Sequence, residues 1–445
     1  SGRQMNYASY VTRTLPEGFK GYDDIVREQD LSHSALNVPK GALPKLLATP
    51  VNAFTAARPA NGSFPLVLYC DGLDGDTVSQ IVLNEYLASH GYVVATIPII
   101  GSSVVDPGQT RAQPDLETTI RDLEVAWSFL KVMRNVDGRK LAVIGHSLGA
   151  IEAVLFAMRN ADVSAVVGLD GTYGFTPNVL TGFYDYNPLH MGAALLDLRR
   201  AQTDTGPSAF VLDLSAVNAL HFSPRTIVTL KGMYHTDFTM FGILAKEFNF
   251  PPFADRNYNT GYAGYQSMCS IVLDFLDLEL KGRSPAEARM AQDVASAPGG
   301  AMRQLPAVGM PPTPNELVGI AVTQGIDTAK AIVDEYHRGA PDDDIVKESA
   351  YNSLGYAMLG RKEYSGAIAA LETDTYVYPR SANLADTLGD MYAGAGQIEM
   401  ARQAYQHALE LLPSDSEQNE SGKNDLKQAI LQSIKSLPAP AAPPT

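Results

Sequence analysis

The sequence predicts an α/β domain with a mostly parallel central sheet, followed by a separate all-α domain of paired helices. Between residues 64 and 230, short apolar runs alternate with segments whose apolar residues recur at helical spacing, a pattern typical of βαβ units. Beyond residue 314, similar residues recur 34 positions apart, which is typical of stacked helical pairs. A length of 445 residues allows two or three domains.

Composition narrows the classes of partner. Hydrophobic residues make up 45% of the chain, enough for packed cores, and no apolar run reaches the length of a membrane span. The net charge of −15 argues against nucleic acid and against an anionic membrane surface as partners. The two cysteines, Cys70 and Cys269, lie far apart in the chain, and we interpret them as buried apolar residues rather than as a disulfide.

The sequence does not fix the cellular compartment of the protein. The chain begins Ser1-Gly2, which is typical of the scar that tag removal leaves, so a targeting signal could have been removed with it. The low lysine content favours a soluble, exported bacterial protein as a working hypothesis for localisation.

The elements leading to the centre of the first domain follow in order. Residues 7–12 and 46–56 are extended stretches that we interpret as antiparallel strands at a sheet edge. Residues 64–70 predict a buried strand, and the glycine-rich loop 71–76 follows it, at the edge where parallel sheets place ligands. We then expect, in chain order, a helix, a strand, a long helix and a strand, over residues 77–90, 92–98, 114–136 and 140–144.

The next segment carries the main candidate for chemistry, Ser147. It reads Gly145-His146-Ser147-Leu148-Gly149, between a buried strand and a helix expected over residues 148–158. A G-x-S-x-G turn needs its glycines because a Cβ at either flank would collide with the neighbouring strand or helix, and the turn holds the serine out toward a base. The alternative is a glycine-flanked serine in an ordinary strand-to-helix turn.

A nucleophilic serine needs a histidine to take its proton and a carboxylate to orient that histidine. We assign His235 as the base because it lies on the loop after the strand expected over residues 225–230. Asp170 directly follows the strand at 165–169 and is the preferred acid. Asp213 stays open as the alternative, although it lies inside an expected strand, FVLDL. We interpret the remaining nearby histidines as structural or surface residues: His146, His190 and His221.

The tetrahedral intermediate of acyl transfer also needs two backbone N–H donors for its oxyanion. We expect one from Leu148, the residue after the nucleophile, and the other from Leu73, in the loop after the first buried strand. For Leu73 the alternative is an ordinary apolar loop residue.

Four segments together resemble the α/β-hydrolases of the platelet-activating-factor acetylhydrolase and dienelactone hydrolase-like group. They are the strand and loop 64–73, the elbow 145–149, Leu169-Asp170 and the histidine loop 230–238, and the resemblance covers roughly residues 45–282. It implies ester hydrolysis without naming the ester. In the acetylhydrolase branch the acid follows the strand after the elbow helix, which supports Asp170. The family commonly has histidine before the oxyanion-loop glycine, where this chain has Asp71.

An aromatic-rich insert follows the acid at residues 172–206. It carries five aromatic residues that could line a substrate pocket under a lid: Tyr173, Phe175, Phe183, Tyr184 and Tyr186. Such a lid would favour an apolar acyl or alcohol group. The alternative is a surface excursion packed by its own aromatic side chains.

The first domain is expected to span residues 1–296 and to close with a helix at 261–280, and residues 297–314 read as a linker. Residues 315–437 look like tetratricopeptide repeats, which often present a surface to a peptide or another subunit; simple bracing of the first domain is the alternative. Residues 342–344 are interpreted as a helix-start charge cluster, and 438–445 as a disordered tail. The repeats show in four pairs at the 34-residue period: Leu354/Leu388, Gly355/Gly389, Ala367/Ala401 and Pro379/Pro413.

The sequence therefore predicts a serine hydrolase that cleaves carboxylic esters through an acyl-enzyme, with no cofactor and no metal. Two alternatives stay open. One is an acyl-peptide or amide hydrolase, since the same residues cleave amides. The other is a silent hydrolase shell whose repeats bind a protein partner or a second copy.

Overall fold

The chain forms two compact units in the computed structural model, Ser1–Ala307 and Val308–Thr445. The structure describes residues 2–12, 20–55, 57–73, 75–103, 108–202, 210–251, 256–341, 345–416 and 419–438. The acidic run 342–344, the tail beyond residue 438 and the last four residues of the expected insert lie outside this set. Among the described residues, no helix combines the length and the apolar character that crossing a membrane requires.

A seven-stranded sheet is the centre of the first unit's described part, with the strand order β4-β3-β5-β6-β7-β8-β9. Strands β3 to β8 run parallel, and β9 pairs with β8 in the antiparallel sense. The strands are β3 (Phe64–Cys70), β4 (Val93–Ile97), β5 (Val136–His146), β6 (Val163–Leu169), β7 (Ala194–Arg200), β8 (Arg225–Leu230) and β9 (Ala301–Leu305).

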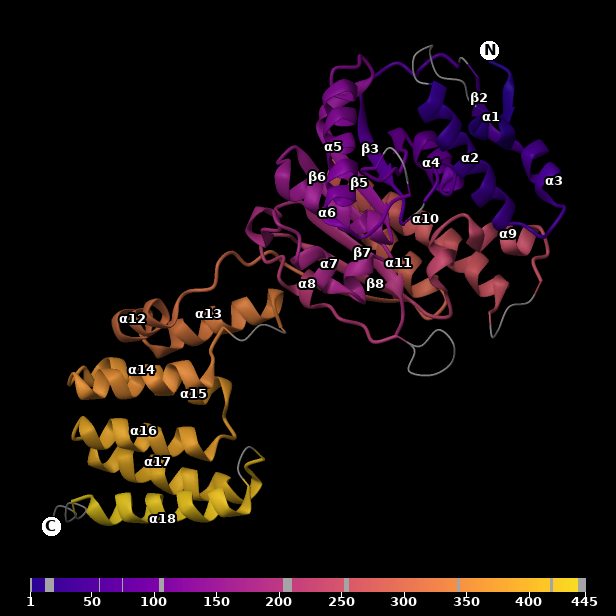
Figure 1. The fold of residues 1–445 in the computed structure, drawn as a ribbon. Helices are drawn as coiled ribbons and strands as arrows, with labels where there is room; N and C mark the ends of the chain where they lie inside the picture. The colour runs from indigo at the N-terminus through magenta and orange to yellow at the C-terminus, as the bar shows by residue number, and fades with distance from the viewer. Residues whose placement is uncertain are drawn as a thin grey trace. The chain divides into compact units, whose positions relative to one another are not determined.

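Helices cover both faces of this sheet, which is why its strands read as continuous apolar runs. Leu66 and Leu68 of β3 pack with α5 (Gln113–Leu130) and α6 (Leu148–Arg159) on one face. The alternate residues of β3 pack in a second apolar cluster, under the helices on the other side of the sheet (Figure 1). That layer contains α4 (Ile81–Ser89), α10 (Tyr258–Lys281) and α11 (Pro285–Ser296).

Strand β7 lies inside the aromatic-rich insert expected at residues 172–206, as a lid or as a surface excursion. It runs between β6 and β8, so residues 194–200 belong to the central sheet rather than to an excursion over the site. The sequence did not predict this strand, because two charged residues, Asp197 and Arg199, interrupt its apolar run. Both are buried, and the Arg199 Nε–H donates to Asp197 Oδ2 at 2.6 Å. Only short helices precede β7 in the insert: η1 (Thr172–Gly174), α7 (Pro177–Thr181) and η2 (Pro188–His190).

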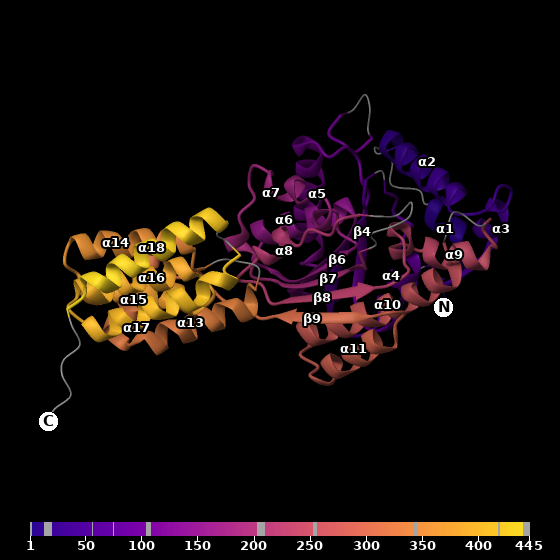
Figure 2. The same ribbon diagram turned by 90° about the horizontal axis from the view of Figure 1, so that it is seen from below.

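The expected linker 297–314 is also partly structured. Residues 301–305 form β9, an edge strand with mostly exposed side chains, beside β8 (Figure 2). Its short mixed sequence, AMRQL, carries no strand signal of its own. The backbone pairing with β8 makes it a strand, and the first unit therefore extends to residue 307.

The N-terminal segment is mostly helical rather than two long strands. Residues 7–11 form α1, because the side chains of Asn6 and Ser9 cap its start reciprocally. The flanking elements are β1 (Gln4–Asn6), α2 (Lys20–Leu36), α3 (Leu43–Ala48) and β2 (Pro50–Phe54). The two strands pair with each other in a small separate sheet, so they extend no edge of the central one.

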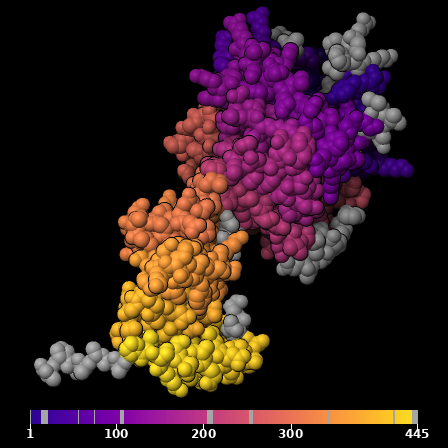
Figure 3. Space-filling model, turned by 60° about the vertical axis from the view of Figure 1, so that its left-hand side comes forward, coloured from indigo at the N-terminus to yellow at the C-terminus, as the bar shows by residue number. Residues whose placement is uncertain are grey.

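The second unit is all helical in its described residues, and its surface runs from orange to yellow in Figure 3. Its main helices are α12 (Pro314–Gln324), α13 (Ile326–Gly339), α14 (Glu348–Gly360), α15 (Tyr364–Val377), α16 (Ala382–Gly394), α17 (Ile398–Leu411) and α18 (Glu420–Ser436). The 34-residue period has a packing cause: a Cβ at Gly355 would lie 2.1 Å from Leu371, and one at Gly389 would lie 2.5 Å from Tyr405. Both glycines therefore allow helices to approach closely. Assignment to the tetratricopeptide class stays a prediction.

Candidate active site

Ser147 stands at the tip of the turn between β5 and α6. Its backbone φ of 54° lies in a region that residues other than glycine rarely adopt. A Cβ at Gly145 would lie 2.1 Å from the Gly149 carbonyl oxygen, and one at Gly149 would lie 2.3 Å from the Asp71 carbonyl oxygen. The two glycines are thus required by backbone contacts on either side, and the turn presents Ser147 at the carboxyl edge of the sheet.

Ser147, His235 and Asp170 meet in one chain of hydrogen bonds. The Ser147 Oγ and His235 Nε2 are 2.8 Å apart, and His235 Nδ1 lies 2.6 Å from Asp170 Oδ2. Asp170 follows β6 directly, and His235 begins the short helix η3 (His235–Phe238) after β8. These strands are neighbours or near neighbours of β5, so their carboxyl ends bring the three residues to one edge.

Burial and two nearby positive charges favour the neutral form of His235. Burial and the charges of His146 and Arg200 lower the pKa of His235, against the opposing effect of its bond to Asp170. Burial alone would raise the pKa of Asp170, but its bond from His235 and the charge of Arg200 outweigh burial, and the pKa lies below its ordinary value. A neutral imidazole held by a carboxylate is able to accept a hydroxyl proton.

The alternative acid, Asp213, lies in a different setting. It does not belong to a regular strand; its Oδ1 accepts a bond from the Ser215 N–H at 2.9 Å, at the start of the short helix α8 (Ser215–Asn218). The expected strand FVLDL is absent there because β7 occupies the place between β6 and β8. The structure thus brings Asp170, and not Asp213, to His235.

The two expected oxyanion donors flank Ser147. Leu148 is the first residue of α6, so its N–H has no acceptor within the helix. On the other side, a Cβ at Gly72 would lie 2.7 Å from Ser147 Cβ, which shows how closely the loop after β3 passes the nucleophile. The Gly72 N–H already donates to Asp71 Oδ1 at 2.8 Å, and the next residue is Leu73, whose side chain is exposed. The roles of Leu148 and Leu73 stay predictions.

Of the five aromatic residues expected to line a substrate pocket, the structure places Phe175 beside the site. Its ring meets the His235 ring edge-on, with centroids 5.7 Å apart. Tyr173 is buried, with its hydroxyl on Asp197 at 3.0 Å. Tyr186 is half-buried and packs against the core.

Phe183 and Tyr184 lie at the far end of α6. The Arg159 guanidinium lies 5.7 Å from the centroid of each ring, and Arg159 is the last residue of the helix that begins beside Ser147. The 12 residues of α6 extend over about 18 Å, so this end of the helix is far from Ser147. Phe183 is a core residue, and Tyr184 lies on the surface with its hydroxyl on Glu117. Their position does not favour a role in substrate contact.

Two neighbours of the site, Thr172 and Arg200, were missed by sequence reasoning. The Thr172 Oγ1 lies 3.3 Å from Ser147 Oγ. Arg200, at the end of β7, donates its backbone N–H to Asp170 Oδ1 at 3.1 Å, and its guanidinium stacks 4.2 Å from the centroid of the Phe210 ring. The signal for Arg200 was its place at the end of a strand, which went unseen with β7 itself. In the described part of the chain, no three His, Cys, Asp or Glu side chains are grouped to hold a metal ion.

Comparisons with known proteins bear on the fold. A family model described as alpha/beta hydrolase fold matches residues 65–223. Cutinase 2 of Thermobifida cellulosilytica is 31% identical over 115 residues, covering 24% of this chain and 40% of that protein. Cutinase est1 of Thermobifida alba is 27% identical over 190 residues, covering 39% of this chain and 59% of that protein. The chain therefore spans less than two thirds of the length of either cutinase.

Similar proteins also include a translocon subunit and an esterase of known structure. An ancillary SecYEG translocon subunit of Neisseria gonorrhoeae is 35% identical over 97 residues, covering 21% of this chain and 42% of that protein. The solved structure of a ferulic acid esterase from Streptomyces cinnamoneus is similar with a TM-score of 0.46 and 21% identity, covering 61% of this chain and 82% of that one. The predicted fold class is confirmed: an α/β-hydrolase fold with a mostly parallel sheet, followed by an all-helical region.

Proposed function

We propose that the chain is a serine hydrolase that cleaves carboxylic esters through an acyl-enzyme intermediate. One observation carries the proposal: the hydrogen-bonded chain from Ser147 through His235 to Asp170, at 2.8 and 2.6 Å, on a strained turn at the edge of an α/β-hydrolase sheet. The similarity to proteins named cutinases supports an ester as the bond that is cleaved.

The reaction follows from the positions of these atoms. Ser147 Oγ attacks the ester carbonyl carbon and passes its proton to His235 Nε2, while Asp170 holds the proton on Nδ1 and stabilises the imidazolium. The N–H groups of Leu148 and Leu73 take the oxyanion. His235 then gives the proton to the leaving alcohol, and the acyl group stays on Ser147. Water, deprotonated by His235, attacks this acyl-enzyme; the acid is released, and His235 returns the proton to Ser147 Oγ.

The first test is labelling of the intact chain with a fluorophosphonate, together with hydrolysis of p-nitrophenyl esters of increasing acyl length. We expect Ser147→Ala to lose labelling and to lower kcat by about 10⁴-fold or more. A matching series of p-nitroanilides separates ester from amide cleavage; faster turnover of the anilides would favour the amide alternative. An intact, folded chain that takes no label would reject the proposal and favour a silent shell.

The acid is tested with a matched pair of variants. Asp170→Asn keeps the shape of the side chain but lets His235 take the wrong tautomer, and we expect kcat to fall by about 10³–10⁴-fold. Asp213→Asn changes the same chemical group away from His235 and should leave kcat within about twofold. The reverse order would assign the acid to Asp213.

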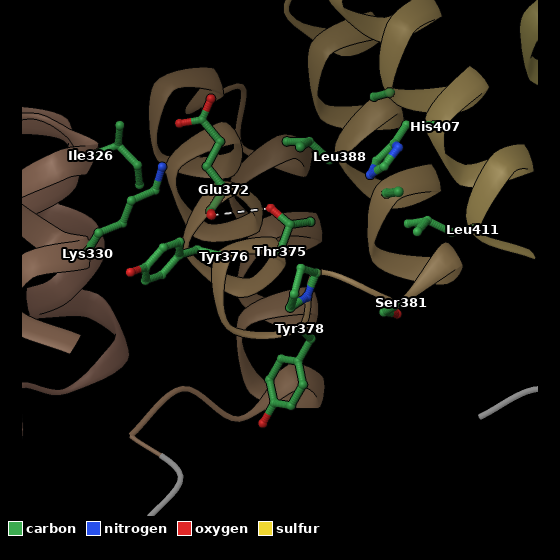
Figure 4. Close-up of a pocket in the computed structure, with 13 residues that line it drawn as sticks. Ile326, Lys330, Glu372, Thr375, Tyr376, Tyr378, Ser381, Leu388, His407 and Leu411 are labelled. Atoms are coloured by element: carbon green, nitrogen blue, oxygen red, sulfur yellow. Dashed lines mark hydrogen bonds between the residues drawn. The ribbon is translucent and has the colours of Figure 1, made fainter. Parts of the chain in front are cut away.

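A second candidate function, binding of another protein chain by the helical unit, is favoured by a pocket of about 330 Å³ between α13, α15, α16 and α17. Figure 4 shows Lys330 and Tyr376 on one side of this pocket and Leu388, His407 and Leu411 on the other. We expect the intact chain to retain a partner, or to self-associate by mass measurement, and Leu388→Arg to abolish that binding. Retention unchanged in Leu388→Arg would reject this pocket as the site.

A further inference from the structure

We propose that Asp71 and His146 form a buried ion pair beneath the site, in which His146 is an imidazolium that positions the candidate base His235 through its main chain. The proposal rests on the proposed function for its effect on catalysis, but not for the existence of the pair.

The pair follows from the sheet register. In the parallel ladder of β3 and β5, Cys70 pairs with Gly145, so the next residues, Asp71 and His146, meet at the carboxyl edge. His146 Nδ1 lies 3.0 Å from Asp71 Oδ1. The two residues are 6% and 3% exposed, so this contact is shielded from water.

The second nitrogen of His146 also faces an acceptor. His146 Nε2 lies 3.3 Å from the main-chain carbonyl oxygen of His235. A carbonyl oxygen can only accept, so Nε2 must carry a proton for this bond. The Asp71 carboxylate likewise accepts at Nδ1, and its Oδ1 also takes the Gly72 N–H. Two acceptors on one ring require both ring protons, and therefore a positive charge on His146.

The surroundings favour the charge on both members. The bonds from His146 and Gly72 outweigh burial and lower the pKa of Asp71, which keeps it a carboxylate. Asp76, on the same loop, is also buried, and burial together with the charges of Asp71 and Asp30 raises the pKa of Asp76. The nearby Asp237 of η3 is paired with Arg256.

The pair can act on His235 in two ways. The bond to the His235 carbonyl fixes the backbone that carries the base, and the two imidazole rings lie 4.9 Å apart at 32°. The charge on His146 also repels a proton on His235, as does Arg200 from β7, whereas Asp170 attracts one. His146 is thus a positioning residue that keeps the base neutral to lower pH.

The charge state can be measured without reference to activity. Nitrogen-15 NMR of the intact chain, labelled at histidine, distinguishes an imidazolium, with two protonated nitrogens, from a neutral ring with one. We expect His146, assigned by the signal that His146→Gln removes, to carry two protonated nitrogens at pH 7. We expect Asp71→Asn to convert it to a neutral ring. A neutral His146 in the unaltered chain would overturn the proposal.

The effect on His235 is tested by the pH dependence of kcat/KM for p-nitrophenyl acetate. Glutamine can still donate to the His235 carbonyl but carries no charge, so the acid limb of His146→Gln should move to higher pH. A unit charge at 4.9 Å predicts a shift of about 0.6 pH unit at the screening of water, and more in a buried site.

His337→Gln is the control for this measurement, because it removes a histidine of α13 in the other unit and should leave the acid limb in place. An acid limb of His146→Gln within about 0.2 pH unit of the unaltered chain would overturn the positioning role. If the unaltered chain hydrolyses no ester, the proposed function fails, and the NMR result still decides the ion pair. If His146→Gln does not fold, the Asp71→Asn spectrum decides it.

Discussion

The close approach of the loop after β3 to the nucleophile makes Gly72→Ala the sharpest test of the oxyanion site. A Cβ at Gly72 would lie 2.7 Å from Ser147 Cβ and 3.2 Å from its Oγ. Ordinary van der Waals contact begins at 3.4 Å, so the loop must withdraw by about 0.7 Å from Ser147. The proposed donor on Leu73 follows directly in the chain and would withdraw with it.

The expected loss is that of one oxyanion donor. Removing one such donor costs about 10²–10³-fold in kcat, and a displacement of the order of 1 Å in a catalytic group has a similar effect. KM should change much less, because the donor acts mainly on the charge that develops in the transition state. Overpacking of this kind also costs about 1–3 kcal/mol in the free energy of unfolding.

The assay is steady-state hydrolysis of p-nitrophenyl acetate at a temperature where thermal unfolding shows the variant to be folded. Gly192→Ala is the matched control, since a Cβ there meets nothing within 4 Å and the residue does not have a positive φ. We expect the control to keep kcat within about twofold. A folded Gly72→Ala with kcat within about threefold of the unaltered chain would refute the reasoning that this loop supplies a donor.

Two further predictions concern buried carboxyl groups. Burial raises the pKa of Glu152 well above 4.5, so its contribution to stability is present below pH 4.5 and is lost as the pH rises. Glu152→Gln should therefore flatten the pH dependence of the free energy of unfolding of the first unit, measured with urea. Equal pH dependence in the variant and the unaltered chain would contradict this. In the helical unit, burial and the charge of Glu348 raise the pKa of Asp374 to about 8, and neither carboxylate oxygen has a hydrogen-bond partner among the described residues. Hydrogen exchange in α15 should therefore speed up from about pH 4 to 8 beyond the intrinsic rate, and Asp374→Asn should remove that excess; an equal excess in the variant would count against it.

The sequence by itself determined the main elements and the positions of the candidate triad. Fully buried parallel strands read as apolar runs, and a residue that follows such a run lies at the carboxyl edge of the sheet. That rule placed Asp170 and His235, and the glycines of the elbow placed Ser147, because backbone contacts on both sides leave no room for a Cβ. The period of 34 residues likewise marked the helical pairs.

The tertiary structure alone decided the features that depend on a partner distant in the chain. Strand β7 stayed hidden because Asp197 and Arg199 look like surface residues until their buried pairing is seen. Strand β9 exists through its pairing with β8, and the aromatic residues after Asp170 mostly entered the core or the far end of α6. The contact between Asp71 and His146 depends on the register of β3 and β5, two strands joined by a long crossover connection. The local sequence pattern indicates which face of a helix or strand is apolar. Buried charge pairs and strand register depend instead on contacts that only the folded chain makes.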